Sequence, residues 1–259
     1  MTNDAAPDAP SAVTIERDGP IAWLVFDHLA RRNAMTLNMW RAVPDRCAEL
    51  AADPTVRVVV LRGAGDQAFV AGADISQFQT ERTSDGAGGY GDATQAAYNA
   101  IEVLPKPTLA MLHGFCIGGG LAIALSADIR YGEPGTRMAL PPAKLGIGYD
   151  EAGLHKLSEL VGPAVTKELV YTGDLHDAET CLRWGLLNHV VAKAELEAFV
   201  RSQAMTMAER APLTQLAAKQ ALAGDPAAAA TIDRCMSSSD YAEGVAAFME
   251  KRSPNFVGE

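Results

Sequence analysis

Residues 56–63, VRVVVLRG, are apolar at almost every position. A strand with one face in water alternates apolar and polar side chains, whereas a strand that is covered on both faces does not. Strands of the second kind occur in parallel sheets, whose neighbours are joined by crossover helices. Helical spacing of apolar residues begins at about Thr36. Pro44, further along this stretch, should kink the helix or mark its true start. Another helix-like stretch covers 92–104. With an apolar strand at 108–114, this order predicts an α/β fold with right-handed crossovers.

The remainder of the chain divides into regions of different character. Residues 1–11 are rich in Ala, Pro and Asp, and we expect a disordered tail there. Two β-rich segments flank the turn sequence DGP at 18–20, which predicts a hairpin. From about residue 151 the pattern is helix after helix. We therefore expect a core domain over 12–200 and a helical C-terminal region over 201–259.

The charge balance and the cysteines narrow the class of protein. The 32 acidic and 22 basic residues give a formal net charge of -10, which disfavours nucleic acid and anionic membrane surfaces as partners. The four cysteines lie far apart, without C-x-x-C spacing or histidines placed to bind zinc, so we expect reduced, buried thiols and no metal site. No window approaches 18 apolar residues, and the N-terminus has no secretory pattern. We expect a soluble, cytoplasmic protein.

Two segments place small residues at the end of an apolar strand. In QAFVAGADISQF, residues 67–78, Gly72 lets the backbone turn sharply, and in HGFCIGGGLAIALSADI, residues 113–129, three glycines directly follow the strand at 108–114 and begin a helix. Amides at a helix start are free and meet the positive end of the helix dipole. Each segment alone is more typical of close packing, but two such turns on neighbouring strands can aim two amides at one carbonyl oxygen, as an oxyanion hole requires. Neither G-x-x-x-x-G-K-S/T nor G-x-G-x-x-G is present, which argues against a nucleotide triphosphatase.

Five separated segments, RRNAM, QAFVAGADI, GFCIGGGLAIALSADI, LGIGYDEAG and EGVAAFMEKRSPNF, together resemble the crotonase superfamily of enoyl-CoA hydratases and isomerases. The resemblance extends from about Val13 to the C-terminus. It implies a spiral of ββα units with a helical C-terminal oligomerisation region, assembly into homotrimers or hexamers, and an acyl-CoA substrate. Coenzyme A is then part of the substrate, and no separate cofactor is expected. The thioester oxygen would lie between the backbone amides of Ala73 and Gly119.

The resemblance also predicts where the substrate binds. Coenzyme A would follow the RRNAM segment and the loop around Gly72, while Phe248 and Lys251 match residues that approach it from a neighbouring subunit. The alternative is that the arginines are merely solvated and that Phe248 lies in the core. The residues predicted to contact the substrate or its coenzyme A are Ala30, Arg31, Arg32, Ala34, Ala71, Gly72, Asp74, Ile75, Gly118, Pro142, Tyr149, Phe248 and Lys251.

The sequence departs from the hydratase pattern at both proton-transfer positions. A hydratase of this family adds water with two glutamates that hold the water and move its protons. The first position, two residues after Gly120, is Ala122 here, and the second, just ahead of LGIG, is Pro142. Because neither side chain can carry a proton, the sequence does not support the usual hydratase mechanism.

Asp150, in the segment LGIGYDE, matches a catalytic position of two other branches of the superfamily. An aspartate there moves protons in dienoyl-CoA isomerases and is the nucleophile in chlorobenzoyl-CoA dehalogenases. The histidine and tryptophan that the dehalogenases also use fall at Asn99 and Pro142, which disfavours dehalogenation. The alternative for Asp150 is a helix N-cap. We expect Glu151 to be exposed, and His113, on a buried strand, to be a structural histidine with satisfied hydrogen bonds.

Three functions follow from these residues. The first is an enzyme that hydrates an enoyl-CoA thioester or shifts its double bond through an enolate, with Asp150 as acid and base. The second is an acyl-CoA binder that keeps the oxyanion hole but has lost proton transfer. The third is hydrolysis of a thioester or an aryl halide with Asp150 as nucleophile. The acyl chain, the pathway and the choice between trimer and hexamer cannot be read from the residues.

Overall fold

The computed structural model describes residues 11–74 and 87–259, so the tail predicted at 1–11 lies outside the described residues except for Ser11, as does Ile75. The strands are β1 (Ala12–Asp18), β2 (Ile21–Asp27), β3 (Val58–Gly63), β4 (Ala68–Val70), β5 (Thr108–Leu112), β6 (Phe115–Ile117), β7 (Ile129–Gly132), β8 (Arg137–Ala139), β9 (His176–Asp177) and β10 (His189–Val190). The helices are η1 (Leu29–Arg31), α1 (Leu37–Ala52), α3 (Ala87–Glu102), α4 (Gly119–Ser126), α5 (Pro142–Leu145), α6 (Glu151–Thr172), α7 (Ala178–Trp184), α8 (Lys193–Ala208), α9 (Pro212–Leu222), α10 (Ala228–Ser237) and α11 (Ser239–Glu250).

The described strands form two sheets. The larger has the order β1-β2-β3-β5-β7-β10, and the smaller has the order β4-β6-β8-β9. Every pair in the larger sheet is parallel except β1 and β2, which form the predicted hairpin with Asp18 opposite Ile21. Mainly parallel strands joined through helices confirm the predicted α/β fold.

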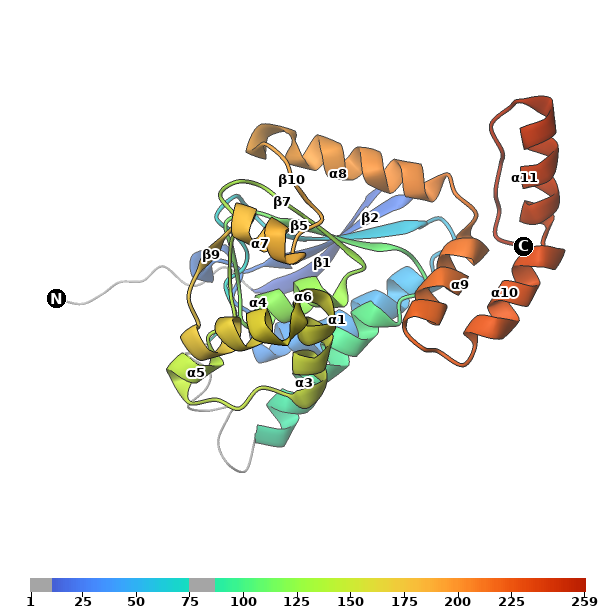
Figure 1. The fold of residues 1–259 in the computed structure, drawn as a ribbon. Coiled ribbons are helices and arrows are strands. Elements are labelled where there is room, and N and C mark those ends of the chain that lie inside the picture. Colours follow the sequence, from blue (N-terminus) through green and yellow to red (C-terminus); the bar gives the residue numbers. More distant parts are fainter. Residues whose placement is uncertain (1–10, 75–86) are drawn as a thin grey trace.

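Strand β3 is buried on both faces, as its apolar run predicts. Val58 and Val60 pack in a cluster with Leu196 of α8. Val59 and Leu61, which alternate with them, belong to the main core together with residues of α1, α3 and α4. Figure 1 shows α8 along one face of the larger sheet and α1 and α3 on the other. The larger sheet is therefore a central layer covered on both sides.

Helix α1 begins earlier than Pro44. The hydroxyl of Thr36 caps its N-terminus by accepting a hydrogen bond from the Met39 amide, so the helix starts at Leu37 and Pro44 lies inside it. The suggestion that Pro44 marks the true start is therefore wrong. The buried face carries the residues that the helical spacing singled out, among them Trp40, and this side chain reaches the site described below.

One prediction about the glycine segment needs correction. The strand at 108–114 does not lead directly into the three glycines, because β5 ends at Leu112 and a further strand, β6, intervenes. Gly114 sits at the crossing, where an added Cβ would lie 1.9 Å from the carbonyl oxygen of Gln67. The chain thus passes from the larger sheet to the smaller one before the glycines. There β6 pairs in parallel with β4, so the two small-residue turns do follow neighbouring strands, as predicted.

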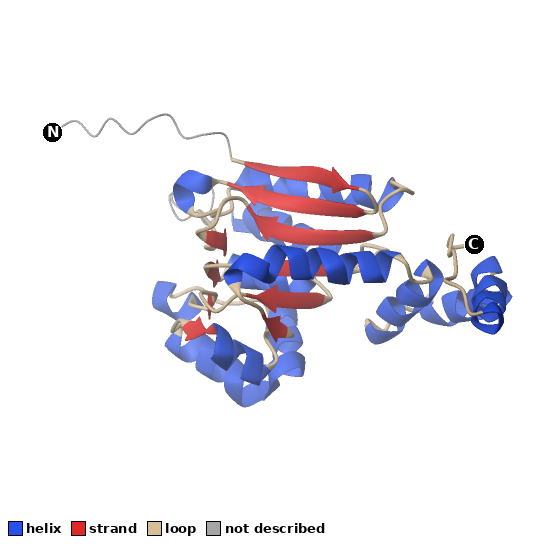
Figure 2. Cartoon of the chain, turned by 90° about the horizontal axis from the view of Figure 1, so that it is seen from above, coloured by secondary structure: helices blue, strands red, loops and turns tan. Residues whose placement is uncertain are grey.

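The C-terminal half is mainly helical, as predicted, with glycines at its breaks. Gly162 has φ 80° and interrupts α6, and Gly173 and Gly185 close α6 and α7 in the left-handed conformation that glycine adopts without strain. Helix α8 runs through residue 200, so the domain boundary predicted there falls inside a helix that packs on the larger sheet. Figures 1 and 2 both place α9, α10 and α11 together, to one side of the sheets.

Candidate active site

Two loops that are 40 residues apart in the sequence are hydrogen-bonded to each other at the ends of the sheets. The Ala71 amide donates to the Arg32 carbonyl at 3.1 Å, the Met35 amide donates to the Gly72 carbonyl at 2.8 Å, and the Asp74 amide donates to the Met35 carbonyl at 2.9 Å. The structure therefore brings the RRNAM segment and the AGAD loop together, as the resemblance predicts.

The Ala73 amide points away from the RRNAM segment. The carbonyl of Gly72 faces Met35, and the N–H of Ala73 belongs to the same peptide unit. In a trans peptide the carbonyl and the N–H point in opposite directions. Among the described residues no acceptor pairs with this N–H. The Ala73 amide is therefore a donor directed into the space beside the loop.

The Gly119 amide is the second donor. Gly118 is the N-cap of α4, and its carbonyl accepts the first helical hydrogen bond, from Ala122 at 3.0 Å. The N–H of Gly119 shares the peptide unit of that carbonyl and so points out of the helix N-terminus, where the helix itself offers no acceptor. No described residue accepts from it. The helix dipole adds positive potential at this N–H.

Close packing of backbone holds the two turns against each other. A Cβ on Gly120 would lie 2.1 Å from the carbonyl oxygen of Val70, so the start of α4 lies directly on the end of β4. A Cβ on Gly72 would lie 3.3 Å from the carbonyl oxygen of Ile117, so the AGAD loop lies against the end of β6. Only a residue without a side chain allows the approach at Gly120, and at Gly72 the positive φ of 115° also favours glycine. The turns that carry the amides of Ala73 and Gly119 thus lie against each other and form one junction.

Aromatic side chains form the base of this junction. Trp40 is fully buried, and a Cβ on Gly119 would lie 3.0 Å from its ring. The Trp40 indole N–H donates to the Tyr90 hydroxyl at 2.9 Å, and the Tyr98 ring packs edge-on against Trp40 with centroids 5.5 Å apart. Sequence reasoning did not single out Tyr98. The sequence signal that was available is its place in the helix-like stretch predicted at 92–104, which precedes the glycine segment.

Neither of the two hydratase positions has a side chain that can carry a proton. Ala122 is buried in the first turn of α4, only three residues after Gly119. Pro142 is the first residue of α5 and is also buried. Both positions are therefore buried and lack a carboxylate.

Asp150 is the N-cap of α6. Its Oδ1 accepts a hydrogen bond from the Gly153 amide at 2.7 Å, and its side chain is exposed. Glu151 is 90% exposed on its side chain, as predicted, and lies 3.6 Å from His155 Nε2. Tyr149 packs against the main core, where burial raises the pKa of its hydroxyl. The predicted capping contact is thus present.

The predicted coenzyme A contacts fall into two groups. Ala30, Arg31 and Arg32 are exposed at the η1 turn, with the Arg32 guanidinium 5.1 Å above the Phe115 ring centroid. Phe248 is 83% exposed and is therefore not a core residue. Figure 1 shows its helix, α11, beyond α9 and α10 and away from α4, so within one chain Phe248 and Lys251 are separate from the two amides.

His113 does not have the satisfied hydrogen bonds that we expected. It is buried at the crossing between the sheets, and its Nε2 has no hydrogen-bond partner among the described residues. Burial, which disfavours the charged imidazolium, lowers its pKa below the usual value of 6.5. His113 is therefore protonated less readily in the folded protein than in the unfolded chain.

This burial predicts a pH-dependent stability. Between the lowered pKa of the folded state and about pH 6.5, the unfolded chain binds more protons at His113 than the folded chain does. The free energy of unfolding therefore falls by up to about 1.4 kcal/mol for each unit by which the pH is lowered in this window. At higher pH the imidazole is neutral in both states. Urea unfolding of the protein and of His113→Gln between pH 8 and pH 5 should show a smaller decline in the variant. The exposed His155→Gln is the matched control, and an equal decline in all three proteins would contradict the assignment.

No group of three potential metal ligands comes together in the described residues. The cysteines are free, with Cys47, Cys116 and Cys181 buried as predicted, whereas Cys235 is only half-buried. None of the described helices is long and apolar enough to span a membrane.

Known proteins are similar to this chain in fold and in sequence. The family of enoyl-CoA hydratases/isomerases matches residues 16–259. A crotonyl-CoA hydratase from Syntrophomonas wolfei is 31% identical over 95% of this chain and 98% of its own length, and a short-chain-enoyl-CoA hydratase from Clostridium acetobutylicum is 33% identical over 93% and 95%. A crystal structure of an enoyl-CoA hydratase/carnithine racemase from Magnetospirillum magneticum superposes with a TM-score of 0.91, at 33% identity and 97% coverage of both chains.

The fold and the family match thus define an acyl-CoA enzyme of the crotonase type. The chain belongs to the enoyl-CoA hydratase/isomerase family, and the predicted resemblance is confirmed.

Proposed function

We propose that this enzyme binds an enoyl-CoA thioester with its carbonyl oxygen between the amides of Ala73 and Gly119 and converts it through an enolate. The observation that carries this proposal is the junction itself, where the close approaches at Gly72 and Gly120 hold two outward-pointing N–H groups together. When a proton leaves the α or γ carbon, negative charge develops on the thioester oxygen. Each preorganised donor can stabilise that charge by about 3 kcal/mol in the transition state.

We propose Asp150 as the acid and base of the reaction. The support is its match to the proton-transferring aspartate of related isomerases and the geometry of its carboxylate. Oδ1 accepts the capping bond from the Gly153 amide, so one oxygen can cap the helix while the other exchanges a proton. An isomerisation would then move one proton from the γ carbon to the carboxylate and return it to the α carbon. Hydration would instead need a water molecule held by the same group.

Replacing Asp150 with asparagine separates catalysis from capping. Asparagine caps a helix about as well as aspartate but cannot exchange a proton, so turnover should fall about 100-fold or more while stability stays unchanged. Asp150→Ala should in addition cost about 1 kcal/mol of unfolding free energy, because the bond to the Gly153 amide is lost. Steady-state kinetics and thermal unfolding of both variants measure the two effects. Full activity of Asp150→Asn would contradict the catalytic role, and Glu151→Gln would then be the next variant.

The reaction itself can be identified by a mass-spectrometric screen. The purified protein is incubated in deuterated water with panels of enoyl-, dienoyl- and aroyl-CoA thioesters. We expect deuterium at the α or γ carbon of a turned-over enoyl-CoA, because an enolate exchanges these protons with solvent. Saturable binding without deuterium incorporation would identify an acyl-CoA binder instead. A covalent acyl-enzyme or aryl-enzyme on Asp150 would identify the hydrolytic alternative.

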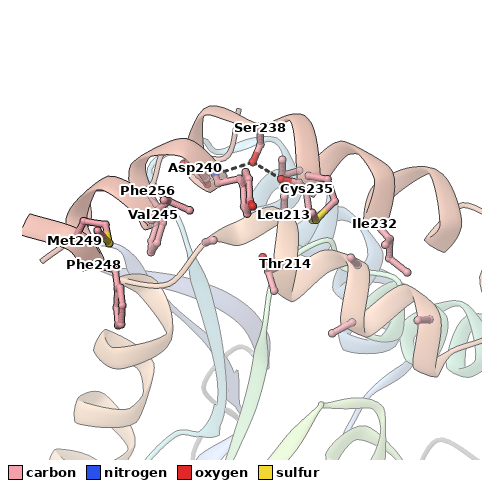
Figure 3. Close-up of a pocket in the computed structure, with 17 residues that line it drawn as sticks. Leu213, Thr214, Ile232, Cys235, Ser238, Asp240, Val245, Phe248, Met249 and Phe256 are labelled. Carbon is pink, nitrogen blue, oxygen red and sulfur yellow. Dashed lines mark hydrogen bonds between the residues drawn. The ribbon is translucent and has the colours of Figure 1, made fainter.

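We propose that the protein assembles as a homotrimer, alone or as a pair of trimers, through α9, α10 and α11. These helices line a groove of about 760 Å³, shown in Figure 3, whose walls are apolar side chains such as Val245, Phe248 and Met249. The exposed fractions of Phe248 and Met249 are 83% and 76%. Apolar surface of this extent is covered in a stable protein. A second copy of the chain is the occupant we favour, because family resemblance places Phe248 and Lys251 near the coenzyme A of a neighbouring subunit.

Charge on this groove should dissociate the oligomer. We expect the wild type to have a mass of three or six times the 27.3 kDa chain in light scattering, and Val245→Glu/Met249→Glu to run as a monomer. Val103→Glu, which alters an exposed valine directly after α3, is the control and should keep the wild-type mass. A monomeric wild type would contradict the proposal.

We further propose a cytoplasmic location, in accord with the free cysteines, and no cofactor beyond the coenzyme A of the substrate.

A further inference from the structure

Tyr98, on α3, places a hydroxyl beside the Gly119 donor. Its Oη lies 3.5 Å from the position that a Cβ on Gly119 would occupy. A Cβ lies about 2.5 Å from the nitrogen of its own residue, so the Tyr98 hydroxyl and the Gly119 nitrogen are at most about 6 Å apart. An oxygen that accepts from both groups, at about 2.7 Å from the hydroxyl and about 2.9 Å from the amide, is compatible with this upper limit.

The surroundings hold this hydroxyl in place. The Tyr98 ring packs edge-on against Trp40, with an interplanar angle of 84°. Trp40 is itself fully buried and hydrogen-bonded to the Tyr90 hydroxyl, so it offers a fixed surface. Tyr98 itself is half-buried, so it is not completely enclosed by this aromatic base. A donor held in this way does not need to reorganise when charge develops next to it.

We propose that the Tyr98 hydroxyl is a third hydrogen-bond donor to the thioester oxygen, beside the amides of Ala73 and Gly119. The inference rests on the proposed function, because it needs the thioester in that junction. The tyrosine keeps its proton throughout. Its hydrogen bond strengthens as the oxygen gains negative charge, since bonds to an ionised acceptor are the stronger ones. Tyr98 thus favours the enolate over the bound substrate and adds to catalysis rather than to binding.

A chromophoric thioester tests this directly. The absorption band of 4-(dimethylamino)cinnamoyl-CoA moves to longer wavelength when donors polarise its carbonyl. We expect a red shift on binding to the wild-type protein and a smaller one on binding to Tyr98→Phe, which keeps the ring and its contact with Trp40. Turnover of the substrate found in the panel screen should fall about 10- to 100-fold in this variant with little change in KM. Tyr131→Phe, which alters a buried tyrosine of β7 packed on Phe199, is the control and should match the wild type in both measurements.

The outcomes separate the two proposals. Equal red shifts and equal turnover in the wild type and in Tyr98→Phe would overturn the role of Tyr98 and leave the two-amide site intact. Bound chromophore without any red shift in the wild type would contradict the proposed site and, with it, this inference. If Tyr98→Phe unfolds at the same temperature as the wild type, the loss of turnover is not caused by loss of folding. A merely structural tyrosine would change stability without moving the absorption band.

Discussion

Replacing Gly119 with proline is expected to lower turnover about 100- to 1,000-fold, because the substitution deletes one of the two amide donors. Proline suits the first position of a helix, whose N–H has no intrahelical acceptor, so α4 can still begin at residue 119. Binding of the thioester should change less than turnover, because the lost interaction is strongest in the transition state. Steady-state kinetics on the substrate found by the panel screen measure both effects.

Gly119→Ala is the matched control for this experiment. Alanine keeps the N–H but adds the same Cβ, which lies 3.0 Å from the ring of the buried Trp40. Its loss of turnover measures the steric effect, and the further loss in Gly119→Pro measures the donor. Ala73→Ser also keeps its amide and should retain much of the activity. Equal losses in Gly119→Pro and Gly119→Ala would count against a role of the amide.

The second large effect concerns water addition. Although the relatives from Syntrophomonas and Clostridium are named hydratases, we expect this enzyme to hydrate crotonyl-CoA at least about 1,000-fold more slowly than the Clostridium protein measured beside it. General acid-base groups contribute about 100- to 10,000-fold each, and both positions, Ala122 and Pro142, lack a carboxylate. The fall in absorbance of the conjugated double bond follows the reaction.

Restoring the carboxylates tests the same account from the other direction. Ala122→Glu combined with Pro142→Glu should raise the hydration rate above that of the paired glutamine variant, which has the same size but no exchangeable carboxyl proton. A wild-type rate close to that of the Clostridium protein would contradict the expectation. It would mean that Asp150 or another acid has taken over the water.

Local patterns in the sequence were sufficient for much of the fold. The apolar run at 56–63 predicted a strand buried on both faces, and β3 is such a strand, because alternation is lost only when both faces are covered. Thr36 starts α1 by a local hydrogen bond, and Gly173 and Gly185 end α6 and α7 by their backbone conformation, which the residues themselves encode. The separate strand β6 was missed, because the change of sheet at Gly114 depends on contact with Gln67, far away in the sequence.

The site was predictable only in part. The residues alone suggested two amide-bearing turns, and the resemblance selected Ala73 and Gly119 among them. The contacts that aim these amides, such as the bridge from Met35 to the AGAD loop, join segments that are distant in sequence. Tyr98 was missed for the same reason, since only the packing of α3 on α4 brings its hydroxyl to Gly119. Asp150 was assigned two roles from the sequence, and the capping bond is the one that the structure contains.

The central claim is that the amides of Ala73 and Gly119 polarise a thioester carbonyl, and the infrared spectrum of that carbonyl tests it most directly. Butanoyl-CoA labelled with carbon-13 at the carbonyl is bound to the wild type and to Gly119→Pro, and the isotope-edited C=O stretch is compared with that of the free thioester. We predict a shift to lower frequency in the wild type that is clearly reduced in Gly119→Pro. A stretch at the frequency of the free thioester in the bound wild type would contradict the account.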